Sequence, residues 1–207
     1  ARRGRLRLDG EALTVEKIVL ASASPRRREI LTLAGIPFEV HPADEETAPA
    51  GLSPRERVLA LARCKAQAVA KKFPDRVVLG ADTIVVLDDT VLGKPHSERE
   101  AKDMLLALQG RAHVVMTAVW VCAPSREDGF VDETTVHFYP VTAEEAAAYV
   151  ATGEPMDKAG AYGVQGLGMR FVRGIEGDFY SVMGLPGGRV RRFLDTFSEI
   201  SQKNGKI

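Results

Sequence analysis

Short apolar runs alternate with amphipathic stretches along most of the chain, from Lys17 onward. Residues 18–21 form a continuous apolar run that predicts a buried strand. Ser24 and Pro25 then supply an N-cap and a proline at the first helical position, and Gly35 ends the predicted helix. A strand that passes into a helix through so short a turn is typical of α/β layered folds.

Three further helices are predicted from pairs in which Ser or Thr precedes Glu by three residues, the pattern of a capping box. The pairs are Ser53 with Glu56, Ser97 with Glu100, and Thr142 with Glu145. They predict helices over 53–72, 97–110 and 142–153, and a last helix is expected over 189–200.

Three long β-like runs, over 77–87, 113–123 and 131–141, complete the pattern. Asp88 and Asp89 after the first run indicate a hairpin turn. The other two runs are joined by a polar stretch without a helix, so we expect them to be antiparallel neighbours. The sequence therefore predicts a mixed α/β fold.

The segment from Gly153 to Gly188 holds 10 of the 19 glycines and few helix signals. Tyr162, Val164 and Phe171 are interleaved with these glycines, which argues against disorder and predicts a tightly folded backbone. We expect an N-terminal arm over 1–16, followed by a single domain over 17–207 with two lobes and a cleft between them.

Composition adds mainly exclusions. The chain has 207 residues, 45% of them hydrophobic, and its 28 basic and 28 acidic side chains cancel. No global field is available to hold a nucleic acid backbone or an anionic membrane, and no apolar run approaches the roughly 20 residues of a membrane span. We expect a cytoplasmic protein without a stable nucleic acid or membrane partner, in which Cys64 and Cys122 are reduced thiols.

The turn between the first strand and the first helix carries two hydroxyls and two guanidiniums, from Ser22, Ser24, Arg26 and Arg27. Free N–H groups and the helix dipole favour an anion there, and arginine matches phosphate oxygens bidentately. In the alternative reading, Ser24 only caps the helix and the arginines are solvated. Consecutive arginines at a helix N-terminus are unfavourable unless an anion compensates, which favours a phosphate site.

Three more charged residues lie in unusual surroundings. Lys65 lies on the apolar stripe of its predicted helix, so its ammonium must snorkel, pair or bind a ligand. Asp82 interrupts an apolar strand, where a carboxylate either satisfies backbone donors, pairs with a cation or holds a metal. Lys94, between Gly93 and Pro95, is held in a stiff turn and is weaker evidence.

An acidic loop, Asp44-Glu45-Glu46, could add a second carboxylate. Carboxylates near phosphates imply Mg²⁺, which takes one or two protein oxygens together with substrate phosphates and waters. The alternative for this loop is a solvated acidic turn.

Four motifs match a known family in order and spacing: Ser22-Ala23-Ser24-Pro25-Arg26-Arg27, Gly80-Ala81-Asp82-Thr83, Gly93-Lys94-Pro95, and GEPMDKAGAYGVQG over 153–166. Over about 17–197 the chain resembles the Maf nucleotide pyrophosphatases. The resemblance implies an elongated mixed α/β fold with a nucleotide cleft between two lobes, similar to inosine triphosphate pyrophosphatase, and frequent homodimers. Met169-Arg170 departs from the small or apolar pair expected after Gly168.

The resemblance also implies roles for individual residues. Asp82 corresponds to the proton acceptor or a metal ligand, and Glu46 to a metal ligand, although Glu45 is one residue away. Phosphate binding is implied for Ser22, Arg27, Lys65 and Lys94. The implied cofactor is Mg²⁺ or Mn²⁺, and the implied partner is a nucleoside triphosphate.

Base specificity is implied by Arg26, Thr83 and Gln165, which match the dTTP/UTP subfamily. The methyl-GTP subfamily would show tryptophan, glutamine and glutamate at these positions. A glutamine carboxamide offers a donor and an acceptor, as the O4/N3 edge of thymine or uracil requires. The expected reaction is hydrolysis of dTTP or UTP to the monophosphate and pyrophosphate.

Other functions remain open from the sequence. One is a pyrophosphatase of different base specificity, for CTP, 7-methyl-GTP or damaged purines, and another is a nucleotide-binding regulator of cell division. A dinucleotide-binding oxidoreductase is disfavoured because the glycines do not follow the first strand as G-x-G-x-x-G.

Overall fold

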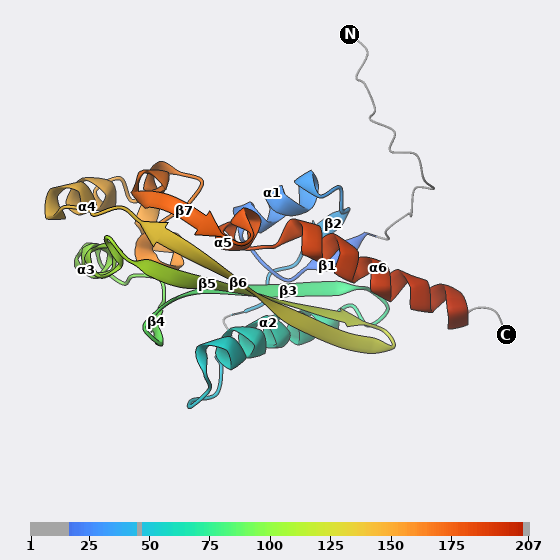
Figure 1. The fold of residues 1–207 in the computed structure, drawn as a ribbon. Helices are drawn as coiled ribbons and strands as arrows, with labels where there is room; N and C mark the ends of the chain where they lie inside the picture. The colour runs from blue at the N-terminus through green and yellow to red at the C-terminus, as the bar shows by residue number, and fades with distance from the viewer. Residues whose placement is uncertain (1–16, 45–46, 205–207) are drawn as a thin grey trace, which may run out of the picture.

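The computed structural model describes residues 17–44 and 47–204, with side chains as far as Phe197. One seven-stranded mixed sheet forms the centre, and α-helices lie on both of its faces (Figure 1). The predicted mixed α/β fold is therefore confirmed. The predicted arm over 1–16 and the acidic pair Glu45 and Glu46 lie outside the described residues.

The sheet has the strand order β2-β1-β3-β5-β6-β7, and β4 pairs with β3 beside this path. The strands are β1 (Ile18–Leu20), β2 (Phe38–Val40), β3 (Val78–Leu87), β4 (Thr90–Leu92), β5 (Ala112–Ala123), β6 (Arg126–Phe138) and β7 (Val172–Glu176). β1 runs parallel to β2 and β3, whereas every other pairing is antiparallel. The expected mixture of parallel and antiparallel strands is present.

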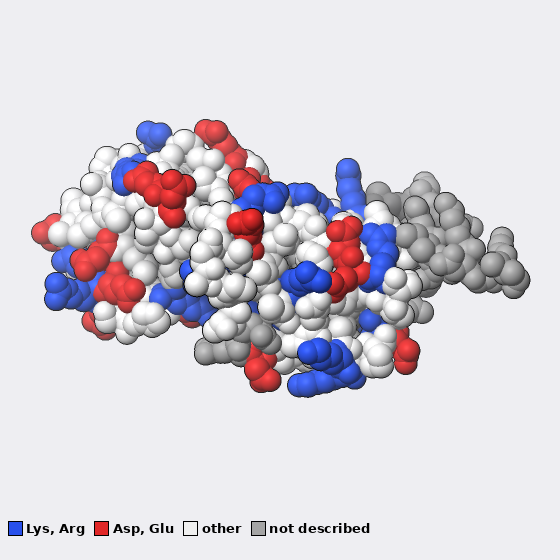
Figure 2. Space-filling view, turned by 90° about the horizontal axis from the view of Figure 1, so that it is seen from below, with Lys and Arg blue, Asp and Glu red and all other residues white. Residues whose placement is uncertain are grey.

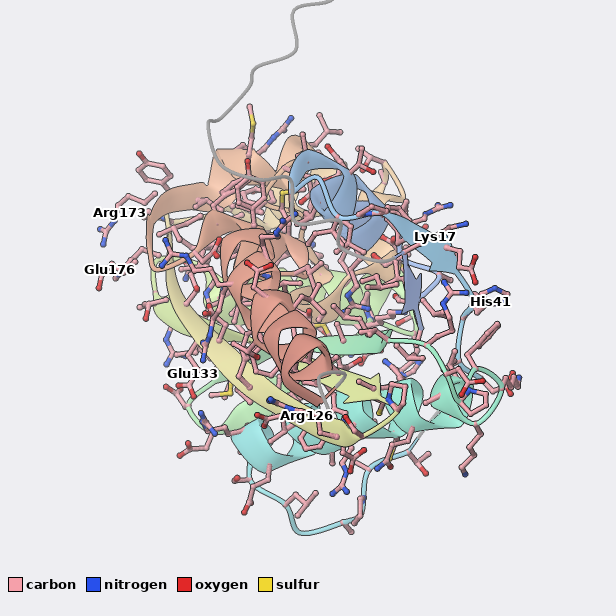
Figure 3. The ribbon with its side chains drawn as sticks, turned by 90° about the vertical axis from the view of Figure 1, so that its right-hand side faces the viewer. Lys17, His41, Arg126, Glu133, Arg173 and Glu176 are labelled. Carbon is pink, nitrogen blue, oxygen red and sulfur yellow. The ribbon has the colours of Figure 1, made fainter. Side chains whose placement is uncertain are left out.

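The α-helices are α1 (Pro25–Leu33), α2 (Pro54–Ala70), α3 (Glu98–Leu108), α4 (Ala143–Val150), α5 (Phe179–Met183) and α6 (Gly187–Asn204). Figure 3 shows α6 and α2 on opposite faces of the sheet. On the face of α6, one large core joins the sheet to α1, α3 and α4. On the other face, α2 buries the apolar side chains of Val58, Ala62, Ala66 and Val69.

β5 and β6 form a long hairpin along the molecule, which is elongated (Figure 1). At one end of it lie α3, α4 and three short 3₁₀ helices, η1 (Glu154–Asp157), η2 (Ala159–Ala161) and η3 (Leu167–Phe171). At the other end lie β1, β2, α2 and most of α6. The glycine-rich segment is thus folded, as its interleaved apolar residues predict.

The predicted helix caps are present in the described residues. Ser53 with Glu56 and Thr142 with Glu145 form complete capping boxes. Ser97 accepts from the amide of Glu100, whose carboxylate turns to the amide of His96 instead. These caps explain why the starts of α2, α3 and α4 could be predicted from the sequence.

The boundaries of β6 differ from prediction. The strand starts at Arg126 rather than at 131, because only Pro124 and Ser125 form the turn of the hairpin. The polar residues after the turn pair with the end of β5, and the strand ends at Phe138, after a register shift. The short elements β2, β7 and α5 were not predicted.

One edge of β3 is interrupted by a gap in strand pairing. β1 pairs with β3 only as far as Leu79, and β4 begins to pair at Val85. Between these points, residues 80–84 have no strand partner on this side within the described chain. α2 borders the gap closely because Gly80 has no side chain, and an added Cβ would lie 2.4 Å from the carbonyl oxygen of Ala62.

The surface and the thiols agree with an ordinary globular protein. Acidic and basic side chains are interspersed on the face shown in Figure 2. No helix in the described ranges has the length and apolar character needed to cross a bilayer. Cys64 and Cys122 are free, as expected, and burial raises the pKa of the Cys122 thiol to about 12.

Candidate active site

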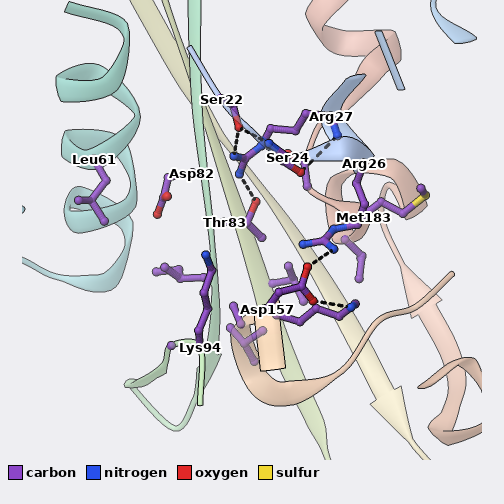
Figure 4. A pocket seen from close by; sticks show the side chains of 18 of the residues that line it. Ser22, Ser24, Arg26, Arg27, Leu61, Asp82, Thr83, Lys94, Asp157 and Met183 are labelled. Atoms are coloured by element: carbon purple, nitrogen blue, oxygen red, sulfur yellow. Dashed lines mark hydrogen bonds and ion pairs between the residues drawn. The ribbon is translucent and has the colours of Figure 1, made fainter. Parts of the chain in front are cut away.

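A pocket of about 620 Å³ lies at the gap beside β3 (Figure 4). This volume lies within the range of roughly 300–1,000 Å³ common for small-molecule sites. Eight of the nine predicted site residues line it: Ser22, Arg26, Arg27, Lys65, Asp82, Thr83, Lys94 and Gln165. The ninth, Glu46, lies outside the described residues. The structure therefore brings together side chains that span most of the sequence.

Arg27 is the most firmly held of these side chains. Its Nη1 donates to Ser22 Oγ at 3.0 Å, its Nη2 to Thr83 Oγ1 at 3.2 Å, and its Nε to the carbonyl oxygen of Gly184 at 2.9 Å. Burial lowers the pKa of Arg27, the charge of Asp82 opposes this shift, and Arg26 adds to it. Since arginine stays protonated in proteins, a fixed positive charge stands at the start of α1.

Ser22 and Ser24 have different roles at this helix start. Ser24 is the N-cap, accepting from the amide of Arg27 at 3.5 Å, as the plainer sequence interpretation held. Ser22 Oγ accepts from Arg27 and, at 3.3 Å, from the amide of Ser24. No acceptor for its own hydroxyl hydrogen occurs in the described residues, so Ser22 can donate to an anion in the pocket.

Lys65 and Asp82 form an ion pair between α2 and β3. Lys65 therefore pairs with a carboxylate, one of the three outcomes that its place on the apolar stripe allowed. Only Asp82 Oδ1 takes part, and Oδ2 accepts no hydrogen bond from residues 17–44 or 47–204. Asp82 and Thr83 point to opposite sides of β3, as alternation along a strand requires (Figure 4).

Two cations in the pocket have no side-chain partner among residues 17–44 and 47–197. Lys94 follows β4 and points into the pocket (Figure 4), and Arg57 lines it from the first turn of α2. Neither side chain makes a hydrogen bond or ion pair with the part of the chain that the structure describes. The sequence analysis missed Arg57, although its spacing of eight residues from Lys65 places both on one face of α2.

Arg26 is tied to a distant segment. Its Nη1 lies 3.1 Å from Asp157 Oδ2 in η1, and Lys158 Nζ lies 2.6 Å from Asp157 Oδ1. Partial burial raises the pKa of Asp157, but hydrogen bonds from Lys158 and Arg26 bring it below its ordinary value. Asp157 and Lys158 also line the pocket and were missed, because charged residues in a turn gave no separate signal.

Glu154 connects the start of the motif over 153–166 to the backbone that follows its end. Its carboxylate accepts from the amides of Leu167 and Gly168, at 2.9 and 3.2 Å, and from Tyr149 Oη at 2.8 Å. Gly166 has to be small, since an added Cβ would lie 2.4 Å from Glu154 Oε1. Glu154 thereby fixes the backbone on the C-terminal side of Gln165, which is exposed and lines the pocket.

The pocket is positively charged overall. Its described lining residues include six cations, from Arg26, Arg27, Arg57, Lys65, Lys94 and Lys158, and three carboxylates, from Asp44, Asp82 and Asp157. Such a lining suits a polyanion. Within the described ranges, no group of three or more His, Cys, Asp or Glu side chains is arranged to hold a metal ion.

Comparison with known proteins agrees with these motifs. The pattern of the family described as "Maf: Maf-like protein" matches residues 17–197. The protein named dTTP/UTP pyrophosphatase of Bacillus cereus (strain ATCC 10987 / NRS 248) is 50% identical over 194 residues, covering 93% of this chain and 95% of its own. The protein of the same name from Bacillus thuringiensis subsp. konkukian is 51% identical over 185 residues, covering 89% and 97%.

Among solved structures, the Staphylococcus aureus Ham1 protein aligns with 76% of this chain and 80% of its own. Its sequence identity is 15% and its TM-score is 0.47.

Proposed function

Because the chain belongs to the Maf-like protein family, we propose that it is a nucleoside triphosphate pyrophosphatase that hydrolyses dTTP and UTP to the monophosphate and pyrophosphate. Relatives that share about half of its residues over most of both chains carry the name dTTP/UTP pyrophosphatase. The observation that carries the proposal is the pocket at the gap beside β3, which gathers the residues implied for phosphate, proton transfer and base recognition.

The pocket extends around the open edge of β3 and so has two sides, one on each face of this strand. Asp82 and Lys65 lie on the side of α2, whereas Thr83 lies on the opposite side of the strand. Apolar side chains of Val164, Val182 and Met183 also line the pocket. We infer that the base packs against these apolar residues near Thr83 and Gln165. The triphosphate then crosses the open edge of β3 toward Asp82.

Four described residues are suited to the phosphates. Ser22 offers a hydroxyl hydrogen with no acceptor in the described chain, Arg27 a fixed guanidinium, and Lys65 and Lys94 two ammonium groups. Preorganised donors of this kind stabilise the charge that builds on the phosphate oxygens in the transition state. The leaving pyrophosphate gains most from them, since it carries away the largest negative charge.

The donor set also fits a divalent cation. Asp82 Oδ2 accepts no hydrogen bond from the described residues, and Mg²⁺ in nucleotide enzymes commonly takes one or two carboxylates together with phosphate oxygens. Asp82 would hold Mg²⁺ or Mn²⁺, with Glu46 as the implied second ligand. When bound, the cation supplies positive charge at the phosphates and a more acidic water.

The chemistry then centres on Asp82. Its carboxylate accepts a proton from, or orients, the water that attacks the α-phosphorus. A new oxygen–phosphorus bond forms while the bond from the α-phosphorus to the bridging oxygen breaks, and pyrophosphate leaves with the bonding electrons. Lys65 holds the carboxylate in place from α2.

The test is release of pyrophosphate, with Mg²⁺, from dTTP, UTP, CTP, 7-methyl-GTP and the ordinary purine triphosphates. Wild type is compared with Asp82→Asn and with Asp132→Asn. Asp132 is a matched control, because it pairs with Arg189 outside the pocket and its side chain is 17% exposed against 16% for Asp82. Turnover of dTTP and UTP that is lost only in Asp82→Asn supports the proposal. No turnover of any nucleotide would refute it.

We also propose a cytoplasmic location, which is expected from the composition of the chain, and a homodimer, which is implied by the resemblance to the family. Light scattering coupled to size-exclusion chromatography tests the dimer, and a monomer at micromolar concentration would contradict it. Fractionation of the source cells tests the location.

A further inference from the structure

Thr83 and Thr117 lie directly opposite each other on β3 and β5, and their hydroxyl oxygens are 2.9 Å apart. Thr117 is fully buried, and its Oγ1 also lies 2.8 Å from the carbonyl oxygen of Ser181 in α5. Thr83 Oγ1 also accepts a hydrogen bond from Nη2 of Arg27. Four groups from α1, β3, β5 and α5 therefore form one chain of hydrogen bonds.

The direction of every bond in this chain is fixed. A carbonyl oxygen can only accept, so Thr117 must donate its single hydroxyl hydrogen to Ser181. Thr117 is left with lone pairs, so Thr83 must donate to Thr117. Arg27 can only donate, and Thr83 accepts from it. The single hydrogen of Thr83 is therefore already used, and a lone pair is all that its hydroxyl can offer to the pocket.

An acceptor cannot bind the phosphates of a nucleotide, because ionised phosphate oxygens are acceptors too. Thr83 is therefore suited to a part of the substrate that carries an N–H or O–H group. Thr83 also lies on the side of β3 away from Asp82. The apolar residues of the pocket include Val115, which is two positions before Thr117 on β5. The base is the part of a nucleotide that packs on apolar side chains.

We propose that Thr117 is a positioning residue for base selection, which fixes Thr83 as an acceptor for the N3–H of uracil or thymine. This inference rests on the proposed pyrophosphatase function. In a 1-substituted uracil or thymine, N3–H is the ring's one hydrogen-bond donor. Cytosine has a lone pair at N3, so its N3 would face the lone pair of Thr83. No hydrogen bond can form between these two acceptors.

The decisive variant is Thr117→Val, which keeps the branched shape and removes the hydroxyl. Thr83 then regains a free hydrogen and can donate to N3 of cytosine as readily as it accepts from N3 of uracil. We expect the ratio of kcat/KM for UTP to that for CTP to fall about tenfold, the worth of one hydrogen bond. Thr117→Ser keeps the hydroxyl and should preserve the wild-type ratio.

A control separates base selection from loss of packing. Thr134 is also fully buried in the sheet, and its hydroxyl binds backbone atoms of Asp178, but it does not line the pocket. Thr134→Val should lower both activities by the same factor or leave both alone. If Thr117→Val also lowers both by one factor, its role is structural and the inference is overturned.

A second substrate pair tests the ribose as the donor. If Thr117→Val leaves the UTP to CTP ratio unchanged and alters the ratio of UTP to 3′-deoxy-UTP, Thr83 accepts from the sugar and the assignment to N3–H is wrong. Should Thr117→Val fail to fold, Thr83→Val serves instead, because this half-buried residue can be changed with less risk to the core. An unchanged UTP to CTP ratio in Thr83→Val overturns the inference.

The two proposals fail in distinguishable ways. If wild type releases no pyrophosphate from any nucleotide, the proposed function fails. If wild type hydrolyses UTP in preference to CTP and Thr117→Val keeps that preference, the pyrophosphatase stands and only the role of Thr117 is refuted.

Discussion

Arg26 and Asp157 are 131 positions apart in the sequence, yet their side chains form an ion pair of 3.1 Å beside the pocket. The pair links the start of α1 to η1, at the other side of the pocket. Lys158 binds the second oxygen of the same carboxylate. Asp157 thereby orients two cations that line the pocket, one of which is implied in base specificity.

We predict that Asp157→Asn raises KM for UTP about three- to tenfold and leaves Tm within about 2 °C of wild type. The Asp157 side chain is 60% exposed, and exposed ion pairs contribute little to stability, about 0–1 kcal/mol. The larger effect of Asp157→Asn should be on substrate binding, because Arg26 is no longer held in place by a carboxylate. Steady-state kinetics and thermal unfolding check both parts, and a large fall in Tm with unchanged KM would contradict the prediction.

Glu154 predicts a pH dependence of stability. Partial burial raises its pKa, but hydrogen bonds from two backbone amides and Tyr149 outweigh this effect, so its pKa lies below the ordinary value of 4.5. A carboxyl group with a lowered pKa stabilises the fold above its unfolded-state pKa, and the stabilisation is lost as the pH falls through the folded-state pKa. Glu154→Gln should therefore destabilise the protein by about 1–2 kcal/mol at neutral pH.

Urea unfolding at a pH of about 7 and of about 3 checks this prediction, since the difference between Glu154→Gln and wild type should shrink at the lower pH. Glu133→Gln is the control, because among the described side chains this half-exposed carboxylate pairs only with Arg55. An equal difference at both values of pH would mean that the charge of Glu154 is not what stabilises the loop.

Gly80→Ala should move α2 away from β3. The new methyl group would lie 2.4 Å from the carbonyl oxygen of Ala62 and 2.6 Å from the amide of Ala66, both in the helix backbone. We expect a loss of about 1–3 kcal/mol of stability and a marked fall in kcat, because Lys65 and Asp82 are held together by this contact. Gly174→Ala on β7 meets nothing within 4 Å and should behave as wild type. An active, stable Gly80→Ala protein would contradict the expectation.

Arg57→Gln should raise KM for UTP about tenfold and change kcat little, because Arg57 lines the pocket and its side chain has no partner among the described residues. Arg55 lies on the same helix and pairs with Glu133 outside the pocket, so Arg55→Gln is the matched control and should leave KM unchanged. Kinetics at two salt concentrations add a second readout, since the effect of Arg57 should weaken as salt rises. Equal effects of the two substitutions would exclude a contact between Arg57 and the substrate.

Residues that break a local rule could be found from the sequence. Lys65 stands in an apolar stripe and Asp82 in an apolar strand, so each needed a partner, and the structure pairs them. Arginines at a helix start needed compensation in the same way. The capped helices and long strands were predictable too, because their signals are local.

Residues that obey local rules could not be found. Thr117 is a β-branched residue in a strand and Arg57 an exposed arginine on a helix, and each becomes informative only through its neighbours in space. The short strands β2 and β7 owe their structure to pairing with distant segments, and α5 has five residues, too few for a periodic pattern. The ion pair of Arg26 with Asp157 depends on the path of the glycine-rich segment, which no local signal specifies.

The uncovered edge of β3 also affects the tendency of the protein to aggregate. An unpaired strand edge is a template on which another chain can add a strand and begin to aggregate. Along this edge of β3, in the part of the chain that the structure describes, only residues 80–84 are uncovered, β1 and β4 close the edge at both ends, and α2 lies close beside it. A small ligand fits this short recess, but an extended segment of a neighbouring molecule finds too little length to pair. The gap that admits a nucleotide is thus too short to start edge-to-edge association at β3.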